Sequence, residues 1–276
     1  AEGIGLGESR CIVRFAEEMN YAPSTAHLTA ALLSASTQTG LSATGRLTAY
    51  DPEGDALIYE IVTQPKKGTV TLLDEGSGDY RYTPASGTFE LRKAICDKLE
   101  RDNDLFYKPQ DIVVSSGAKH SLYNIFQAII DPGDEVLIPS PDYPLWTACV
   151  TLAGGRAVHY VCDEQSDWNP DIADIRKKVT SRTKAIVLIN PNNPTGALYP
   201  REILEKITDL AREHHLILFA DEIYDRTVMD GHEHVALASL APDLLTLSYN
   251  GLSKSHFACG MRSGWMCICG NKEGAE

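Results

Sequence analysis

The sequence has no long apolar run, no Cys-x-x-Cys pair and no excess of basic residues. Without an apolar run of membrane-spanning length, no transmembrane helix is predicted. No basic start followed by an apolar core is seen, so no signal peptide is predicted either. The net charge of −13 argues against nucleic acid or an anionic membrane as a partner.

Cysteines and histidines show no metal-binding spacing. The seven cysteines are scattered and odd in number, which predicts reduced thiols in a cytoplasmic protein. Cys267 and Cys269 alternate within an apolar run, as on one face of a buried strand. His232 and His234 lie in a polar loop, where solvated side chains are expected. No metal site is predicted among these residues.

The chain changes character near residue 82. Residues 1–44 are rich in Ala, Ser, Thr and Gly and form a poorly defined segment, with short helices expected at 12–19 and 26–34. Residues 45–83 hold short β-type runs separated by turn residues. Residues 84–276 alternate between helix and strand patterns and form the second predicted domain.

The stretch 45–83 resembles one incomplete cadherin-like or immunoglobulin-like repeat of bacterial surface proteins. The matching pieces are Ala49–Asp55, Val62–Pro65, Lys67–Val70 and Tyr80–Pro84. Asp51, Glu53 and Asp55 could supply oxygen ligands to calcium, and a solvated acidic turn is the alternative. On the calcium reading, the chain would be an adhesion-type module with an inert C-terminal part.

The second domain predicts an α/β fold with a mostly parallel seven-stranded sheet flanked by helices. Strands buried on both faces appear as apolar runs, and strands separated by helices imply parallel pairing. Ligand sites in such sheets lie at the carboxyl ends of the strands. The expected strands are 112–115, 135–138, 157–161, 185–189, 216–220, 244–249 and 265–269, and the expected helices are 89–101, 122–130, 172–179 and 201–214.

Residues that could bind a cofactor follow several of these predicted strands. Ser253 and Lys254 precede Arg262 by a few residues, and the motifs Asn190–Gly196 and Asp221–Tyr224 lie upstream. A lysine amine can bond to the aldehyde of pyridoxal 5'-phosphate (PLP), and an acid can pair with the ring nitrogen so that the ring withdraws electrons. An arginine can bind the phosphate through two hydrogen bonds. The pattern predicts a PLP enzyme.

Residues 82–276 resemble the large, PLP-binding domain of class I/II aminotransferases (fold type I PLP enzymes). Residues 110–138 look more like aspartate aminotransferases. From Pro139 onward the chain is more similar to bacterial alanine (glutamate–pyruvate) aminotransferases. The runs that carry this likeness are Pro139–Trp146, Asn190–Gly196, Phe219–Asp225 and Asn250–Lys254.

The resemblance implies roles for the residues around the cofactor ring. Lys254 would link to the cofactor and then move the proton at the substrate Cα. Asp221 would keep the ring nitrogen protonated. Tyr224 and Asn193 would donate hydrogen bonds to the phenolate oxygen of the cofactor. These bonds would lower the pKa of the aldimine between the cofactor and Lys254.

The resemblance also implies a phosphate site and a stacking residue. Arg262 would bind the phosphate, assisted by Ser253. The backbone amides of Ala118 and Lys119, at a helix N-terminus, would add to it. Tyr143 would stack on the pyridine ring, whereas Trp146 is interpreted as a packing residue.

Tyr82 matches the tyrosine that reaches the phosphate of the neighbouring subunit, so a homodimer is expected. It also fits the end of the β-rich stretch, which is the alternative interpretation. Gly251 stands where most of the family has Ser or Thr. The C-terminal small domain, with the arginine that binds the substrate carboxylate, has no counterpart in the sequence.

The expected function is transfer of an amino group between an L-amino acid (alanine, glutamate or aspartate) and a 2-oxo acid. A PLP-dependent lyase or decarboxylase, and a PLP-binding fragment without turnover, remain alternatives.

Overall fold

In the computed structural model the chain forms two compact units, residues 1–93 and 94–276. The structure describes residues 11–15, 26–28, 43–46, 57–61, 68–77 and 79–271. The predicted α/β fold is confirmed in the second unit.

The first unit contains two three-stranded antiparallel sheets, with strand orders β2-β1-β4 and β3-β6-β5. The short β-type runs predicted within residues 45–83 are confirmed at 57–61, 68–74 and 79–84. The predicted helices at 12–19 and 26–34 are wrong, because strands occupy 11–15 and 26–28. The first of these carries β-branched and aromatic residues, which favour a strand. The strands are β1 (Cys11–Phe15), β2 (Ala26–Leu28), β3 (Ala43–Arg46), β4 (Leu57–Ile61), β5 (Gly68–Asp74) and β6 (Asp79–Pro84).

The proposed calcium ligands Asp51, Glu53 and Asp55 lie outside the described residues. In the acidic turn after β5, Asp74 accepts hydrogen bonds from the backbone amides of Gly76 and Ser77, at 2.8 and 2.6 Å. This is an Asx-type turn, in which the carboxylate satisfies backbone donors.

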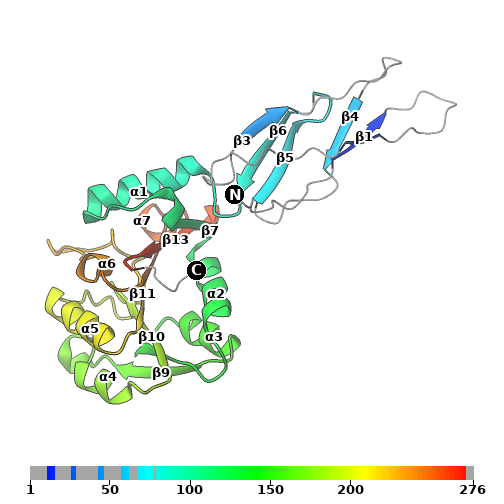
Figure 1. Cartoon of the computed structure of the whole chain (residues 1–276). Coiled ribbons are helices and arrows are strands. Elements are labelled where there is room, and N and C mark those ends of the chain that lie inside the picture. Colours follow the sequence, from blue (N-terminus) through cyan, green and yellow to red (C-terminus); the bar gives the residue numbers. More distant parts are fainter. Residues whose placement is uncertain are drawn as a thin grey trace. The chain divides into compact units, whose positions relative to one another are not determined.

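Helix α1 (Phe89–Asn103) is followed by an alternation of strands and helices (Figure 1). The strands are β7 (Ile112–Ser116), β8 (Glu135–Ser140), β9 (Arg156–Val161), β10 (Thr183–Ile189), β11 (Ile217–Asp221), β12 (Thr246–Gly251) and β13 (Ser263–Cys269). The α-helices are α2 (Ala118–Ile129), α3 (Leu145–Leu152), α4 (Ile172–Lys178), α5 (Arg201–Glu213), α6 (Leu237–Leu240) and α7 (Leu252–Ser255), and the 3₁₀ turns are η1 (Pro109–Asp111), η2 (Glu164–Ser166) and η3 (Cys259–Met261).

All seven predicted strands form one sheet, in the order β7-β13-β12-β11-β10-β8-β9. In this sheet β13 alone runs antiparallel to the rest. The mostly parallel sheet predicted from the sequence is therefore confirmed. Because β13 is reversed, its first residues lie at the edge where the other strands end.

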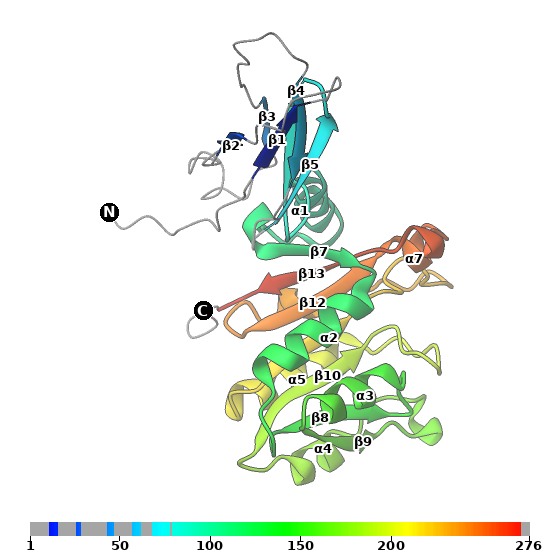
Figure 2. The ribbon, with the colours of Figure 1, turned by 90° about the vertical axis from the view of Figure 1, so that its right-hand side faces the viewer.

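Helices cover both faces of the sheet, and alternate strand residues divide between two cores. One core packs Leu137 and Ile186 against α4 and α5. The other packs Val136 and Val187 against α2 and α3. Figure 2 shows α2 and α3 lying across the sheet face that is turned toward the viewer. The continuous apolar runs of the strands are explained by this two-sided burial.

The four helices predicted within residues 84–276 are confirmed, whereas α3, α6 and α7 are additions. Pro144 is the N-cap of α3 and precedes its first turn, where proline is tolerated. Asp171 caps α4 by accepting hydrogen bonds from the backbone amides of Ala173 and Asp174.

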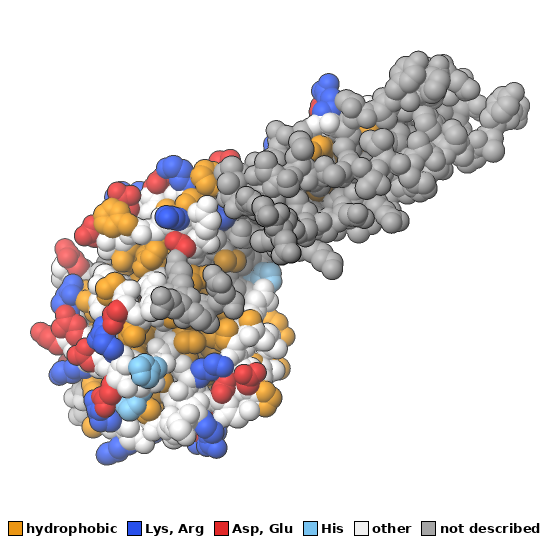
Figure 3. Space-filling view, in the orientation of Figure 1, with side chains coloured by type: hydrophobic (Ala, Val, Ile, Leu, Met, Phe, Trp, Pro, Cys, Tyr) orange, Lys and Arg blue, Asp and Glu red, His pale blue; other side chains and the backbone are white. Residues whose placement is uncertain are grey.

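The described surface mixes charges of both signs. Acidic and basic side chains intermingle with apolar ones on the face shown in Figure 3. No helix in the described part of the chain has the length and apolarity to cross a bilayer. Six of the seven cysteines form no disulfide: Cys96, Cys149, Cys162, Cys259, Cys267 and Cys269. Cys267 and Cys269 are both buried in β13, as predicted.

Candidate functional site

A cavity of about 300 Å³ lies at the edge where the parallel strands end. Its volume is at the lower end of what small-molecule sites have. Nine of the ten site residues predicted from the sequence line this cavity: Ala118, Lys119, Tyr143, Asn193, Asp221, Tyr224, Ser253, Lys254 and Arg262. The structure thus brings together residues spread over 145 positions of sequence.

Strand direction explains this convergence. Asp221 ends β11, and Lys254 lies in α7, directly after β12. Arg262 immediately precedes β13. Since Gly251 of β12 pairs with Gly264 of the antiparallel β13, the start of β13 lies beside the end of β12. Arg262 therefore lies at the same edge of the sheet as Asp221 and Lys254, although it precedes its strand and they follow theirs.

Asp221 is a partly buried carboxylate with few partners. Its Oδ1 accepts a hydrogen bond from the backbone amide of Ile223 at 3.3 Å, and its Oδ2 accepts one from Trp146 Nε1 at 3.2 Å. Burial, only partly offset by these bonds, raises the pKa of Asp221 to about 6. A cation placed against this carboxylate would restore its charged form.

Two lysines lie against aromatic rings of the cavity. Lys254 Nζ is 5.7 Å from the ring centroid of Tyr224, and Lys119 Nζ is 5.1 Å from that of Tyr143. Both distances are within the range of cation–π attraction. This contact with Tyr224 holds the amine of Lys254 in the cavity.

Arg262 lies against the N-terminus of α2. Gly117, the N-cap, has φ +79°, and a Cβ atom there would overlap the Arg262 guanidinium. A Cβ at Gly264 would overlap the backbone nitrogen of Ala118. Two glycines thus let the arginine and the first amides of α2 meet closely. The first amides of a helix lack intrahelical acceptors, so this corner suits an anion.

Gly251 is explained by the same close approach. A Cβ at this position would lie 2.8 Å from the backbone oxygen of Ser263 and 3.1 Å from Cα of Gly264. The β12–β13 pair leaves no room for a side chain. A serine or threonine at this position would therefore require the paired strands to shift.

Sequence reasoning missed the role of two buried aromatic residues, Trp146 and Tyr249. Trp146 is 0% exposed, as a packing residue would be, yet it also donates a hydrogen bond to Asp221. Tyr249 lines the cavity, and its buried hydroxyl has no hydrogen-bond partner. A buried indole N–H or phenol normally finds a partner, which is the signal that could have drawn attention to both. The other lining residues are Leu122, Leu145, Ile223 and Cys259.

Tyr82 belongs to β6 in the first unit, where it pairs with Val70 and Ala43. It fits a β-strand, as the alternative interpretation of the sequence held. Its predicted contact with a neighbouring subunit's phosphate stays a prediction.

Among the described residues, no group of three histidine, cysteine or acidic side chains could hold a metal. The cavity residues do fit PLP. The uncompensated Asp221 carboxylate suits a protonated ring nitrogen, and the corner formed by Gly117 and Arg262 suits a phosphate. The Tyr249 hydroxyl, which has no hydrogen-bond partner in the protein, could bond to a polar group of the cofactor.

Comparison with known proteins agrees with this fit. The family model "Aminotransferase class I and II" matches residues 46–273. Glutamate-pyruvate aminotransferase AlaA of Escherichia coli K12 is 50% identical over 195 residues, which cover 71% of this chain and 48% of that protein. An alanine aminotransferase of Mycobacterium tuberculosis is 50% identical over 196 residues, covering 71% and 46%. The crystal structure of an Escherichia coli aminotransferase superposes with a TM-score of 0.68 at 50% identity, covering 70% of this chain and 48% of that one.

The chain thus spans about half the length of the relatives it matches. These comparisons do not support the predicted cadherin-like character of residues 45–83. The match to the family model already begins at residue 46, inside that stretch.

Proposed function

The chain belongs to the class I and II aminotransferases, and from this premise we propose that its cavity binds PLP and serves the transfer of an amino group. The amino donor would be an L-amino acid, with alanine, glutamate or aspartate as candidates, and the acceptor a 2-oxo acid. The observation that carries this proposal is the convergence of nine predicted residues on one cavity.

PLP supplies an electron sink that stabilises negative charge developing at the substrate Cα. Lys254 would hold the cofactor covalently when substrate is absent. Once released, its amine would take the proton from the substrate Cα and return it during the exchange. Its place over the Tyr224 ring keeps the amine inside the cavity.

Asp221 would hold the proton on the ring nitrogen. The hydrogen bonds from Trp146 and from the amide of Ile223 favour the ionised carboxylate, which is the form that binds a pyridinium. A buried carboxylate is costly without such a partner. Tyr224 and Asn193 would donate hydrogen bonds to the phenolate oxygen, and Tyr143 would stack on the ring.

The phosphate would lie at the N-terminus of α2. Arg262 would bind it through its guanidinium, and the amides of Ala118 and Lys119 would complete the site. Ser253 would contribute a hydroxyl, and it is the more important because Gly251 offers none.

A cytoplasmic homodimer is part of the proposal. The free thiols are typical of a reducing compartment. In the dimer, Tyr82 would reach the phosphate in the neighbouring subunit.

The test is an absorbance titration of the purified chain with PLP. We expect a visible band, absent in Lys254→Ala and retained in Lys206→Ala, which changes an exposed lysine of α5. L-alanine or L-glutamate should then bleach the band. A band that ignores amino acids would support PLP binding without turnover. If no band forms while the circular dichroism spectrum shows a folded chain, the proposal is wrong.

A further inference from the structure

The turn after β11 presents side chains to two sides. Asp221 and Tyr224 line the cavity. Glu222 and Asp225, from the same turn, are instead buried within the protein, Glu222 at 7% exposure and the Asp225 side chain at 6%. The backbone links the two sets, because the amide of Asp225 donates to the carbonyl of Glu222 at 3.0 Å. Whatever fixes the buried acids also fixes the residues in the cavity.

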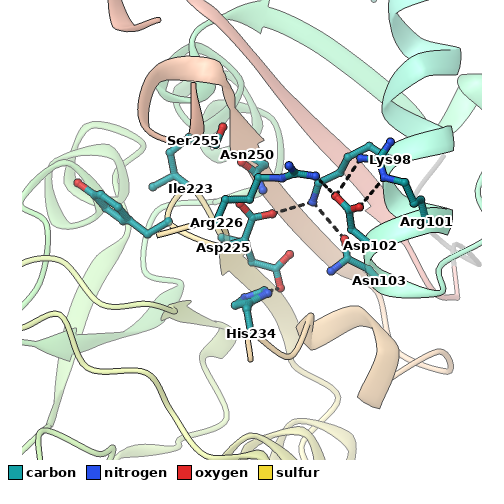
Figure 4. Close-up of polar contacts among 12 residues, drawn as sticks. Lys98, Arg101, Asp102, Asn103, Ile223, Asp225, Arg226, His234, Asn250 and Ser255 are labelled. Carbon is teal, nitrogen blue, oxygen red and sulfur yellow. Dashed lines mark hydrogen bonds and ion pairs between the residues drawn. The ribbon is translucent and has the colours of Figure 1, made fainter. Parts of the chain in front are cut away.

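Asp225 is held by a lysine from α1. Lys98 Nζ lies 2.6 Å from Asp225 Oδ2, and the two side chains are 17% and 6% exposed. The same amine donates to Asn103 Oδ1 at 3.1 Å. Figure 4 shows this pair beside a second one, between Arg226 and Asp102, which joins the same helix to the same turn. The turn is therefore anchored to α1 at two successive residues.

Glu222 anchors the other side of the turn. Its Oε1 accepts a hydrogen bond from the amide of Leu237, at the start of α6, at 2.8 Å. His234 Nε2 lies 3.9 Å from the same oxygen, and this imidazole is 5% exposed at its side chain. This contact holds the start of the turn, whereas Lys98 holds the residue directly after Tyr224.

We infer that Lys98 is a positioning residue for the proposed PLP site. Through its ion pair with Asp225 it fixes the turn that carries Asp221 and Tyr224, and so orients the hydroxyl of Tyr224 toward the cofactor. Buried ion pairs contribute little net stability, and their best-attested use is to select one arrangement of the chain. This inference rests on the proposed function, because it concerns the geometry of that site.

The test compares Lys98→Met, which removes the charge, with Lys98→Arg, which keeps it. Lys178→Met is the matched control. Lys178 also pairs with an aspartate at 2.6 Å, Asp174 of the same helix α4, and it does not line the cavity. Two quantities are measured: PLP affinity, from quenching of tryptophan fluorescence, and the pH midpoint of the absorbance change of the bound cofactor.

Lys98→Met should weaken PLP binding by about 10- to 100-fold, the scale expected when a group in the site is misplaced. The pH midpoint should rise, because a displaced Tyr224 no longer stabilises the phenolate form. Lys98→Arg and Lys178→Met should behave like the unaltered chain. The other polar groups that face this pair are Asp102, Asn103, Glu222, Arg226 and His234.

A Lys98→Met chain that keeps both the affinity and the midpoint would overturn the inference. If that variant fails to fold, the double variant Lys98→Met/Asp225→Asn removes the unpaired buried charge. A folded double variant with weakened binding and a raised midpoint supports the positioning role, and one that matches the unaltered chain overturns it. If the unaltered chain binds no PLP, the proposed function fails first, and the two failures are distinct.

Discussion

Replacement of Asp221 by asparagine should stabilise the chain in the absence of cofactor. Asp221 lies at the end of β11, where burial raises the pKa of its carboxyl to about 6. Near neutral pH the ionised carboxylate therefore destabilises the folded state. An asparagine of the same shape removes that charge and still accepts the hydrogen bond from the Ile223 amide.

The magnitude follows from the pKa. The ordinary value is 3.8 and the folded value about 6, and at about 1.4 kcal/mol per pKa unit the difference is about 3 kcal/mol. For an acid with a raised folded pKa, the stability contributed by its protonated form is present below pH 3.8 and lost as the pH rises through about 6. Because Asp221 is only partly buried, solvent screens its charge, and we expect about 2 kcal/mol of this range between pH 4 and pH 7.5.

Urea unfolding followed by tryptophan fluorescence measures this difference. All three tryptophans lie in residues 94–276, so the signal reports the unit that holds the cavity. The free energy of unfolding of Asp221→Asn, relative to the unaltered chain, should grow by about 2 kcal/mol from pH 4 to pH 7.5. Any lost hydrogen bond to Trp146 adds a constant that does not depend on pH.

Asp230→Asn is the control, because Asp230 is exposed and its positive φ of 57° suits asparagine. Its effect should be the same at both pH values. A pH-independent difference for Asp221→Asn as well would refute the reasoning. The same variant should lose PLP affinity while gaining stability, as is common where a site stores uncompensated charge.

Two further substitutions test single contacts of the cavity. Gly117→Ala should lower PLP affinity at least about tenfold, because its Cβ displaces the guanidinium of Arg262. Gly133→Ala, with φ +97° and open space around it, should share the backbone strain but keep the affinity in the same titration. Trp146→Phe keeps an aromatic side chain but removes the N–H bond to Asp221, so the pKa of Asp221 should rise by about 1. The pH dependence of PLP binding measures that rise, and an unchanged midpoint would show that the bond is not formed.

The fold of residues 94–276 was predictable because the inner strands of the sheet, such as β8, β10 and β12, are buried on both faces. Runs such as 185–189 and 265–269 carry apolar residues at every position, and the observed strands extend them by only a few residues. Helix α3 was not predictable in the same way. It is short, mostly apolar and preceded by prolines, so it carries no distinct amphipathic pattern from which a helix could be predicted.

Much of the cavity was also predictable, since its residues follow the ends of parallel strands. What the sequence could not show depends on packing between distant segments. Lys98 and Asp225 are 127 positions apart, and Trp146 and Asp221 are 75 apart. Neither pair follows a local period, so no pattern in the chain indicates the contact. The first unit was harder still, and the helices expected there gave way to strands.

The arrangement of the cavity suggests why folding and cofactor binding should be coupled. The site carries a carboxylate whose pKa is raised by burial and a tyrosine hydroxyl with no partner. Both are unfavourable in the folded protein, and both suit a ligand with a protonated ring nitrogen and polar substituents. When such a ligand binds, its cationic ring nitrogen compensates the negative charge of the ionised Asp221 carboxylate. Ligand binding should therefore raise the free energy of unfolding more in the unaltered chain than in Asp221→Asn. Without ligand, Asp221→Asn is the more stable of the two.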